Sequence, residues 1–219
     1  MLVNGSIVAL VTPFNQDGTV NFDKLGELIE FHIANKTDAI LVLGTTGETP
    51  TLTHEEDDSV VEYSIKKAAK RIPIYVGAGS NSTQTQLTYC KKYGAMGAEG
   101  LLVITPYYNK GNAQGIYQHF KVVADAVNIP LILYNVPSRT GCAIPYEVVE
   151  ELSKHPNVAA IKEASGNISY FDKVAKLACD DFKIYSGNDD MVVPALSMGA
   201  SGVISVAANI IPEQMHDMV

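Results

Sequence analysis

Residues 158–164 read VAAIKEA, a nearly continuous apolar run that is interrupted by Lys162. Such runs are typical of parallel strands that are covered on both faces, where an ammonium group without a partner is costly to bury. Burial favours the neutral amine, which is a nucleophile able to form a Schiff base with a carbonyl compound. Alternatively, Lys162 ends the strand and its charged head reaches solvent. The run predicts a buried strand and leaves both interpretations of the lysine open.

Seven further apolar runs recur along the chain, separated by segments with helical spacing. Thr53 and Glu56 form a capping box at one helix start, and Gly94 is predicted to end another helix. Eight near-regular units without a long insertion predict an α/β fold, a (β/α)8 or TIM barrel, rather than the alternative of an open doubly wound sheet. The predicted strands are residues 7–11, 39–43, 74–76, 100–104, 131–134, 158–161, 183–185 and 202–206, and the predicted helices are residues 23–34, 55–71, 83–93, 115–127, 146–154 and 170–179.

The composition excludes several classes of protein. The chain has 219 residues, 47% of them hydrophobic, which is enough for one domain with a large core. A net charge of -8 and the lack of a basic stripe argue against a nucleic-acid partner. The cysteines, Cys90, Cys142 and Cys179, lack paired spacing and are typical of reduced thiols in a cytoplasmic protein. We expect no signal peptide, and no apolar run approaches the ~20 residues of a membrane span.

The residues after each predicted strand matter most, because the active sites of barrels form at the carboxyl ends of the strands. Tyr134 ends the strand before Lys162, so its phenol is expected to face the same cavity and relay protons, although aromatic residues also favour strands in general. Arg139 lies in the next loop, where its guanidinium would suit a substrate carboxylate, although most loop arginines are merely solvated. The five histidines are scattered, and no metal site is predicted.

Glycine-containing stretches follow several strands. Residues 44–48 (GTTGE) lie between a predicted strand and a predicted helix, where backbone N–H groups could converge on a carboxylate, or simply form a tight turn with hydroxyl caps. Gly187 lies where barrels often bind phosphate, although a small residue there could equally ease packing. Residues 77–79 (GAG) lack the third glycine of a dinucleotide-binding fingerprint, since Ser82 stands there, so that function is not predicted.

Three stretches together resemble signatures of the dihydrodipicolinate synthase / N-acetylneuraminate lyase family of class I aldolases. They are residues 44–48 (GTTGE), 134–141 (YNVPSRTG) and 161–166 (IKEASG). The match runs in order from the N-terminus to about Pro212, and its fold agrees with the barrel derived above. The resemblance implies that Lys162 condenses with the keto group of pyruvate, and that the covalent Schiff base is used without any further cofactor.

The resemblance also implies roles for the surrounding residues. Tyr134 would donate and accept protons during Schiff-base formation. Thr45 and Thr46 would bind the pyruvate carboxylate and join Tyr134 in a proton relay. Gly187 and Ile204 would contribute backbone contacts around the bound pyruvate.

The second substrate follows from Arg139 within the resemblance. The string SRTG at residues 138–141 resembles members that use L-aspartate-4-semialdehyde, whereas sialic-acid lyases usually carry an apolar residue in place of Arg139. The expected reaction is the condensation of pyruvate with this semialdehyde to the hydroxylated tetrahydrodipicolinate that leads to diaminopimelate and lysine. Another pyruvate aldolase, of the N-acetylneuraminate lyase or keto-sugar acid type, is the alternative.

Family members normally continue past the eighth strand into a full closing helix and a C-terminal helical domain, whereas only residues 212–219 follow here. We therefore expect one barrel over residues 1–219, truncated at its C-terminus, with apolar surface uncovered near strands eight and one. Tyr108 completes the relay in the family from a neighbouring subunit. A homo-oligomer is thus expected, with a dimer favoured over a tetramer, and a catalytically impaired remnant is a further alternative.

Feedback inhibition by lysine is not expected. Many members of the family bind lysine near the segment that here contains His54, Asn81 and Tyr107. Asp57 and Thr85 stand where the lysine-sensitive pattern has a histidine and a glutamate.

Overall fold

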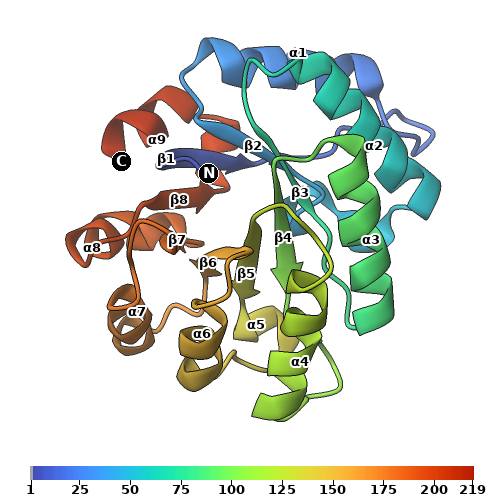
Figure 1. Cartoon of the computed structure of the whole chain (residues 1–219). Helices are drawn as coiled ribbons and strands as arrows, with labels where there is room; N and C mark the ends of the chain where they lie inside the picture. The colour runs from blue at the N-terminus through green and yellow to red at the C-terminus, as the bar shows by residue number, and fades with distance from the viewer. Residues whose placement is uncertain (1) are drawn as a thin grey trace.

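Eight parallel strands form a closed ring at the centre of the molecule (Figure 1). The computed structural model describes residues 2–219. Strand β8 pairs back onto β1, with Ile204 beside Ile7, so the predicted (β/α)8 barrel is confirmed and the open-sheet alternative is wrong. The strands are β1 (Gly5–Ala9), β2 (Ala39–Val42), β3 (Ile74–Gly77), β4 (Gly100–Ile104), β5 (Leu131–Asn135), β6 (Val158–Glu163), β7 (Lys183–Ser186) and β8 (Gly202–Ser205).

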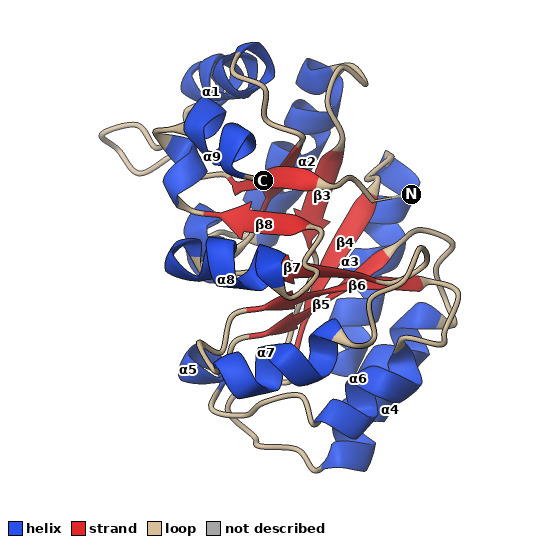
Figure 2. Cartoon of the chain, turned by 90° about the vertical axis from the view of Figure 1, so that its left-hand side faces the viewer, coloured by secondary structure: helices blue, strands red, loops and turns tan. Residues whose placement is uncertain are grey.

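Helices surround the ring, as the blue segments around the red strands in Figure 2 show. The predicted capping box is present at the start of α2, where the Glu56 carboxylate accepts from the Thr53 N–H at 2.8 Å and the Thr53 hydroxyl accepts from the Glu56 N–H at 3.2 Å. The helices are α1 (Phe22–Ala34), α2 (His54–Ala68), α3 (Thr83–Met96), α4 (Ala113–Ala124), α5 (Pro137–Thr140), α6 (Tyr146–Leu152), α7 (Ile168–Ala175), α8 (Val192–Ser197) and α9 (Pro212–Met218), and the short 3-10 turns are η1 (Thr45–Gly47), η2 (Thr49–Thr51), η3 (Asp189–Met191) and η4 (Ala207–Asn209).

Some element boundaries differ from the sequence-based expectation. Helix α3 continues through Gly94 to Met96 and is capped by Gly97, whose φ of +103° is a left-handed conformation that glycine adopts without steric cost. Strand β6 includes Lys162 and ends at Glu163, beyond the predicted end at residue 161. Helix α8 is absent from the sequence-based prediction, because six residues are too few to display a helical period.

The strand side chains alternate between two apolar layers, as the period of two in a strand requires. One layer fills the barrel and includes Ile7, Leu41, Ile132 and Ile204, while the other lies between the strands and the helices. Because both faces are covered, the strands read as continuous apolar runs instead of alternating ones.

The cover over β8 and β1 is more complete than expected. The apolar residues of both strands are buried, and Met215 of α9 packs with only 2% of its surface exposed. The expectation of uncovered apolar surface is therefore wrong for the residues within these two strands, but Val206, which follows β8 directly, is 50% exposed. The large exposed apolar side chains lie on helices and turns instead. After Tyr108, the most exposed of them are Val193, Val206 and Ile210.

None of the helices formed by residues 2–219 is long and apolar enough to cross a membrane.

Candidate active site

Lys162 lies inside the barrel near the carboxyl end of β6. Its neighbours at alternate positions, Ala160 and Ala164, belong to the layer that fills the barrel, and Lys162 itself is only 5% exposed. The pKa of the Lys162 amine is lowered to about 8, mainly because the amine is buried. The positive charge of Arg139 also lowers this pKa, whereas the negative charge of Asp189 opposes the shift. Roughly a tenth of the amine is thus neutral at pH 7, far more than for a solvated lysine. The interpretation of Lys162 as a solvated strand end is wrong.

Tyr134 is the direct neighbour of Lys162 in the sheet. The two residues are paired in register across β5 and β6, and the Lys162 Nζ lies 4.5 Å from the centre of the Tyr134 ring. Burial raises the pKa of the Tyr134 phenol above its usual value of 10, while Thr45 and the charge of Arg139 lower it. The phenol therefore keeps its proton at neutral pH and can donate it to an oxygen bound next to the amine.

The Thr45–Thr46 pair lies in η1, directly after β2. Thr45 is exposed, Thr46 is half-buried, and the Thr45 side chain is close enough to Tyr134 to influence the pKa of its phenol. The turn is held in place by Thr12, whose hydroxyl donates to the carbonyl of Gly47 at 2.7 Å. The structure thus brings the Thr45 hydroxyl to the Tyr134 phenol, and Thr46 follows Thr45 in the same turn.

Gly187 follows β7 and lies against the Lys162 side chain. A Cβ at this position would be 2.6 Å from the Ala164 Cβ and 3.0 Å from the Lys162 Cε, so a larger residue would press on the lysine. Ile204 is fully buried in the layer that fills the barrel. The close approach explains why a glycine stands at position 187, which the sequence alone left open.

Arg139 and Tyr108 lie on the rim, outside the buried pair. Arg139 is exposed in α5, and its charge reaches Lys162 and Tyr134 strongly enough to lower the pKa of both groups. The side chain of Tyr108 is 87% exposed, and its backbone N–H donates to the carbonyl of Thr140 at 3.3 Å. Tyr108 therefore does not join the buried pair within one chain.

A hollow of about 280 Å³ opens beside the buried pair, and Thr45 and Tyr134 form part of its wall. His54, Asp57 and Tyr107 line the same hollow. The pKa of the Asp57 carboxyl is raised to about 7, mainly by burial and also by the neighbouring charges of Asp58 and Glu56. The sequence did not predict that Asp57 would be buried.

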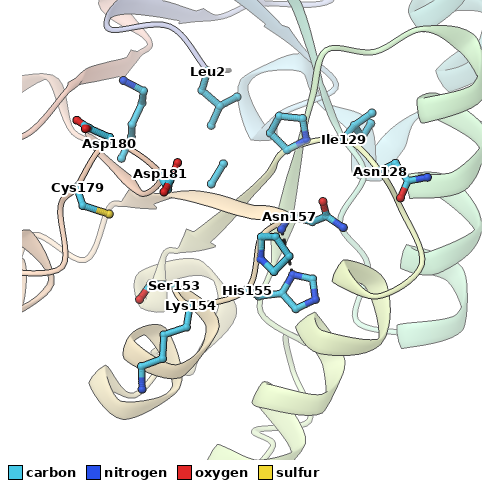
Figure 3. A pocket seen from close by; sticks show the side chains of 14 residues that line it. Leu2, Asn128, Ile129, Ser153, Lys154, His155, Asn157, Cys179, Asp180 and Asp181 are labelled. Atoms are coloured by element: carbon cyan, nitrogen blue, oxygen red, sulfur yellow. Dashed lines mark hydrogen bonds between the residues drawn. The ribbon is translucent and has the colours of Figure 1, made fainter.

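A larger hollow, of about 700 Å³, lies at the amino ends of the strands (Figure 3). Its wall includes Ser153, Lys154 and His155 before β6, and Cys179 and Asp181 before β7. The Lys154 ammonium is exposed and pairs with Glu151 at 2.9 Å, and His155 pairs with Asp125 at 3.2 Å. These are surface pairs at the end of the barrel that contributes stability, and not catalysis, in this fold.

Three polar residues near Lys162 were not assigned from the sequence. Glu163 and Asn135 are buried side by side, with the Asn135 amide donating to the Glu163 carboxylate at 2.6 Å. Asp189 accepts from the backbone N–H groups of Val206 at 3.1 Å and Ala207 at 2.9 Å. The signal that could have identified these residues is their position in the sequence. Glu163 follows Lys162, Asn135 follows Tyr134, and Asp189 lies two residues after Gly187. Among residues 2–219 there is no group of three or more His, Cys, Asp or Glu side chains arranged to hold a metal ion.

Comparisons with known proteins agree over nearly the whole chain. Residues 2–219 match the dihydrodipicolinate synthetase family. The 4-hydroxy-tetrahydrodipicolinate synthase of Caldicellulosiruptor saccharolyticus is 52% identical over 218 residues, which cover 100% of this chain and 74% of that protein. The crystal structure of dihydrodipicolinate synthase from Aquifex aeolicus gives a TM-score of 0.95 at 46% identity, covering 98% of this chain and 73% of that one. The dihydrodipicolinate synthase from Acinetobacter baumannii, complexed with pyruvate, gives a TM-score of 0.96 at 42% identity, covering 99% and 74%.

Proposed function

The chain belongs to the dihydrodipicolinate synthetase family, and from that premise we propose that its active site condenses pyruvate with L-aspartate-4-semialdehyde through a Schiff base on Lys162. The product is 4-hydroxy-tetrahydrodipicolinate, and the enzyme is a lyase of lysine and diaminopimelate biosynthesis. The observation that carries this proposal is the buried Lys162 amine, with a pKa lowered to about 8, beside the protonated Tyr134 phenol. The relatives at about half identity favour this reaction over a sialic-acid or keto-sugar acid aldolase.

The first half of the reaction forms the Schiff base. The neutral Lys162 amine adds to the keto carbon of pyruvate, and the carbonyl oxygen leaves as water after it has been protonated. Tyr134 is the proposed donor, because its ring lies 4.5 Å from the Lys162 Nζ and its raised pKa keeps the proton available. The deprotonated Tyr134 is then the proposed acceptor of a proton from the methyl group of the bound pyruvate, which gives the enamine that attacks the aldehyde.

The pyruvate carboxylate is proposed to bind at η1. Thr45 and Thr46 offer hydroxyl groups, and the first N–H groups of a short helical turn lack partners within the turn. The backbone of Gly187 and Ile204 would hold the other side of the pyruvate. The close packing of Gly187 against Lys162 supports this position, because it leaves the lysine a narrow range of orientations.

Arg139 is proposed to bind the carboxylate of the semialdehyde. The guanidinium is exposed at the rim, and its charge acts on both Lys162 and Tyr134. A planar cation there suits a carboxylate on a substrate that enters after pyruvate has been fixed to the lysine. We assign no metal ion or further cofactor to the reaction, and the cytoplasmic location expected from the sequence stays a prediction.

Tyr108 is proposed to act in the site of a second copy of the chain. Its side chain is 87% exposed, and its backbone adopts a φ of +75°, an unusual conformation for a tyrosine. A homodimer in which each copy supplies Tyr108 to the other would complete the proton relay from Thr45 and Tyr134. The preference for a dimer is a proposal, tested by sedimentation velocity of the wild type and of Tyr108→Ala.

Borohydride trapping tests the proposed function directly. The protein is incubated with pyruvate and borohydride, its intact mass is measured, and the modified peptide is mapped. We expect one reduced pyruvyl group on the peptide that contains Lys162, together with condensation activity when the semialdehyde is supplied. An adduct on another lysine, or trapped pyruvate without condensation of the semialdehyde, would contradict the proposal at the first or the second step.

A further inference from the structure

Asn135 and Glu163 form a buried hydrogen-bonded pair directly behind the candidate catalytic residues. Asn135 follows Tyr134 at the end of β5, and Glu163 follows Lys162 at the end of β6. The two residues are paired in register across the sheet, and they are 0% and 3% exposed. Since successive strand side chains point to opposite faces, the pair lies on the outer face while Tyr134 and Lys162 point into the barrel.

The pair also ties both ends of the loop that carries Arg139. This loop comprises residues 136–144 and begins immediately after Asn135. The Asn135 side-chain carbonyl accepts from the backbone N–H of Ile144 at 2.9 Å, so one residue holds the start and the end of the loop. Within the loop, the backbone N–H of Arg139 donates to the backbone carbonyl of Val136 at 2.9 Å.

Glu163 determines which way the Asn135 amide points. One carboxylate oxygen accepts from the Asn135 amide at 2.6 Å and the other accepts from the backbone N–H of Ser165 at 2.7 Å. The two donors approach different oxygens, and a glutamine at 163 would place an NH2 donor at one of these two positions, so it could satisfy only one of them in this geometry. The carboxylate is therefore needed to keep the Asn135 carbonyl directed at Ile144.

We propose that Asn135 and Glu163 are positioning residues that set the Arg139 loop at a fixed distance from Lys162, and thereby determine the affinity for the aldehyde substrate. The inference rests on the proposed function, because it assigns the loop to recognition of the semialdehyde carboxylate. Strands β5 and β6 carry the reacting pair on one face and the hydrogen-bonded pair on the other, so the hydrogen-bonded pair fixes the loop relative to the lysine without contacting the lysine side chain. Neither residue touches the substrate.

Exchanging the two polar groups tests the proposal. In Asn135→Asp the two carboxylates oppose each other, and in Glu163→Gln a donor is left without an acceptor. In the double variant, the carboxylate introduced at position 135 can accept from the Ile144 N–H and from the amide introduced at position 163. The oxygen of that amide accepts from Ser165, so every contact is restored with the charge moved to the other strand. We expect each single variant to raise the KM for the semialdehyde about tenfold or more, and the double variant to recover most of that loss.

Two further readouts separate positioning from general stabilisation. Trapping of pyruvate on Lys162 should change much less than the KM for the semialdehyde in the single variants. Hydrogen exchange of the peptide covering residues 136–144 should be fast in the single variants and slow again in the double variant. Asn157→Asp is the matched control, because Asn157 is a structural amide at the other end of the barrel that donates to the carbonyls of Ala124 and Val127. It should lower the melting temperature without a selective change in KM.

The outcomes distinguish this proposal from the function on which it rests. Hydrogen exchange requires no substrate, so it judges the pair even if the wild type fails to condense the semialdehyde. If a single variant does not fold, a folded double variant with near wild-type KM supports the proposal. A double variant no better than the single variants, or single variants with unchanged exchange and KM, overturns it.

Discussion

The two ends of the barrel differ in what they do with polar groups. At the carboxyl ends of the strands, a hollow of about 280 Å³ borders Tyr134, which pairs with the buried Lys162 amine. At the amino ends, a hollow of about 700 Å³ is lined by solvated lysines, aspartates and a histidine (Figure 3). The larger hollow carries no buried amine and no buried carboxylate among its lining residues. The candidate active site is therefore distinguished by the desolvation of particular groups and not by the volume of its cavity.

The amino end of the barrel is closed by hydrogen bonds and by close backbone packing. The Tyr75 phenol accepts from the backbone N–H of Val3 at 3.0 Å, and the Tyr185 phenol donates to the Val3 carbonyl. Gly5 and Gly202 meet where β1 joins β8, and a Cβ at Gly202 would lie 2.0 Å from the carbonyl oxygen of Gly5. The two tyrosines fill the amino end of the barrel, and the two glycines let its first and last strands pack closely. Both roles are structural.

The largest expected effect comes from removing the buried amine. Lys162→Ala should abolish pyruvate trapping and lower kcat by several orders of magnitude, because no other group among the site residues can form the imine. Lys154→Ala at the amino end removes an exposed lysine of the same size and serves as the control. Borohydride trapping and steady-state kinetics on both variants make the comparison, and residual trapping in Lys162→Ala would break it.

Removing the Tyr134 hydroxyl should have the next largest effect. Tyr134→Phe keeps the ring beside the Lys162 Nζ but removes the proton donor, so kcat should fall by about 10²- to 10⁴-fold, the usual contribution of general acid–base catalysis. Tyr185→Phe removes the phenol that closes the amino end and should lower the melting temperature instead. Equal losses of kcat in the two variants would show that the two ends do not differ as described.

Arg139→Ala should affect the second substrate selectively. Loss of a charge-assisted contact with a carboxylate costs ~2–3 kcal/mol, or about 30- to 150-fold in kcat/KM for the semialdehyde. Pyruvate trapping should persist, because Lys162 and Tyr134 are unchanged. Full condensation activity, or a parallel loss of trapping, would show that Arg139 has another role.

The pH dependence of trapping reports the desolvation of Lys162. Only the neutral amine attacks, and its pKa is lowered to about 8, so the trapping rate should rise about tenfold per pH unit below pH 8 and level off above it. The Tyr134 phenol keeps its proton over this range because its pKa is raised. Asp189→Asn removes a negative charge that raises the pKa of Lys162, so the inflection should move to lower pH. An inflection at the ordinary lysine pKa of 10.5 would mean that the amine is solvated.

The smallest effect is expected at the larger hollow. Lys183 lines it and donates to the side-chain carbonyl of Asn4, close to the N-terminus. Lys183→Ala should change kcat and both KM values by less than about twofold, as is usual for substitutions of partly exposed side chains away from a site. A tenfold loss of activity would show that the amino end takes part in the reaction.

The strand and helix pattern was largely predictable from the sequence. The runs at residues 100–104 and 131–134 appear as β4 and β5 with almost no change, and the Thr53–Glu56 capping box begins α2. These signals are local, because a strand or cap depends on residues a few positions apart. Helix α8 was missed because six residues carry too little periodic signal. The predicted helix end at Gly94 is wrong, because local propensity cannot show that packing carries α3 through this glycine.

The sequence by itself also determined which residue types the site would contain, through the three stretches that resemble the family. Only the tertiary structure decided that Lys162 is desolvated and that the Gly187 backbone packs closely against its side chain. It also decided that Asn135 and Glu163 form a buried hydrogen bond on the outer face of the sheet. It also placed Asp189 close enough to oppose the lowering of the lysine pKa. Burial and electrostatic interaction depend on atoms brought together from strands that are far apart along the chain. No periodicity or propensity within one segment encodes those distances, and closure of the barrel sets them.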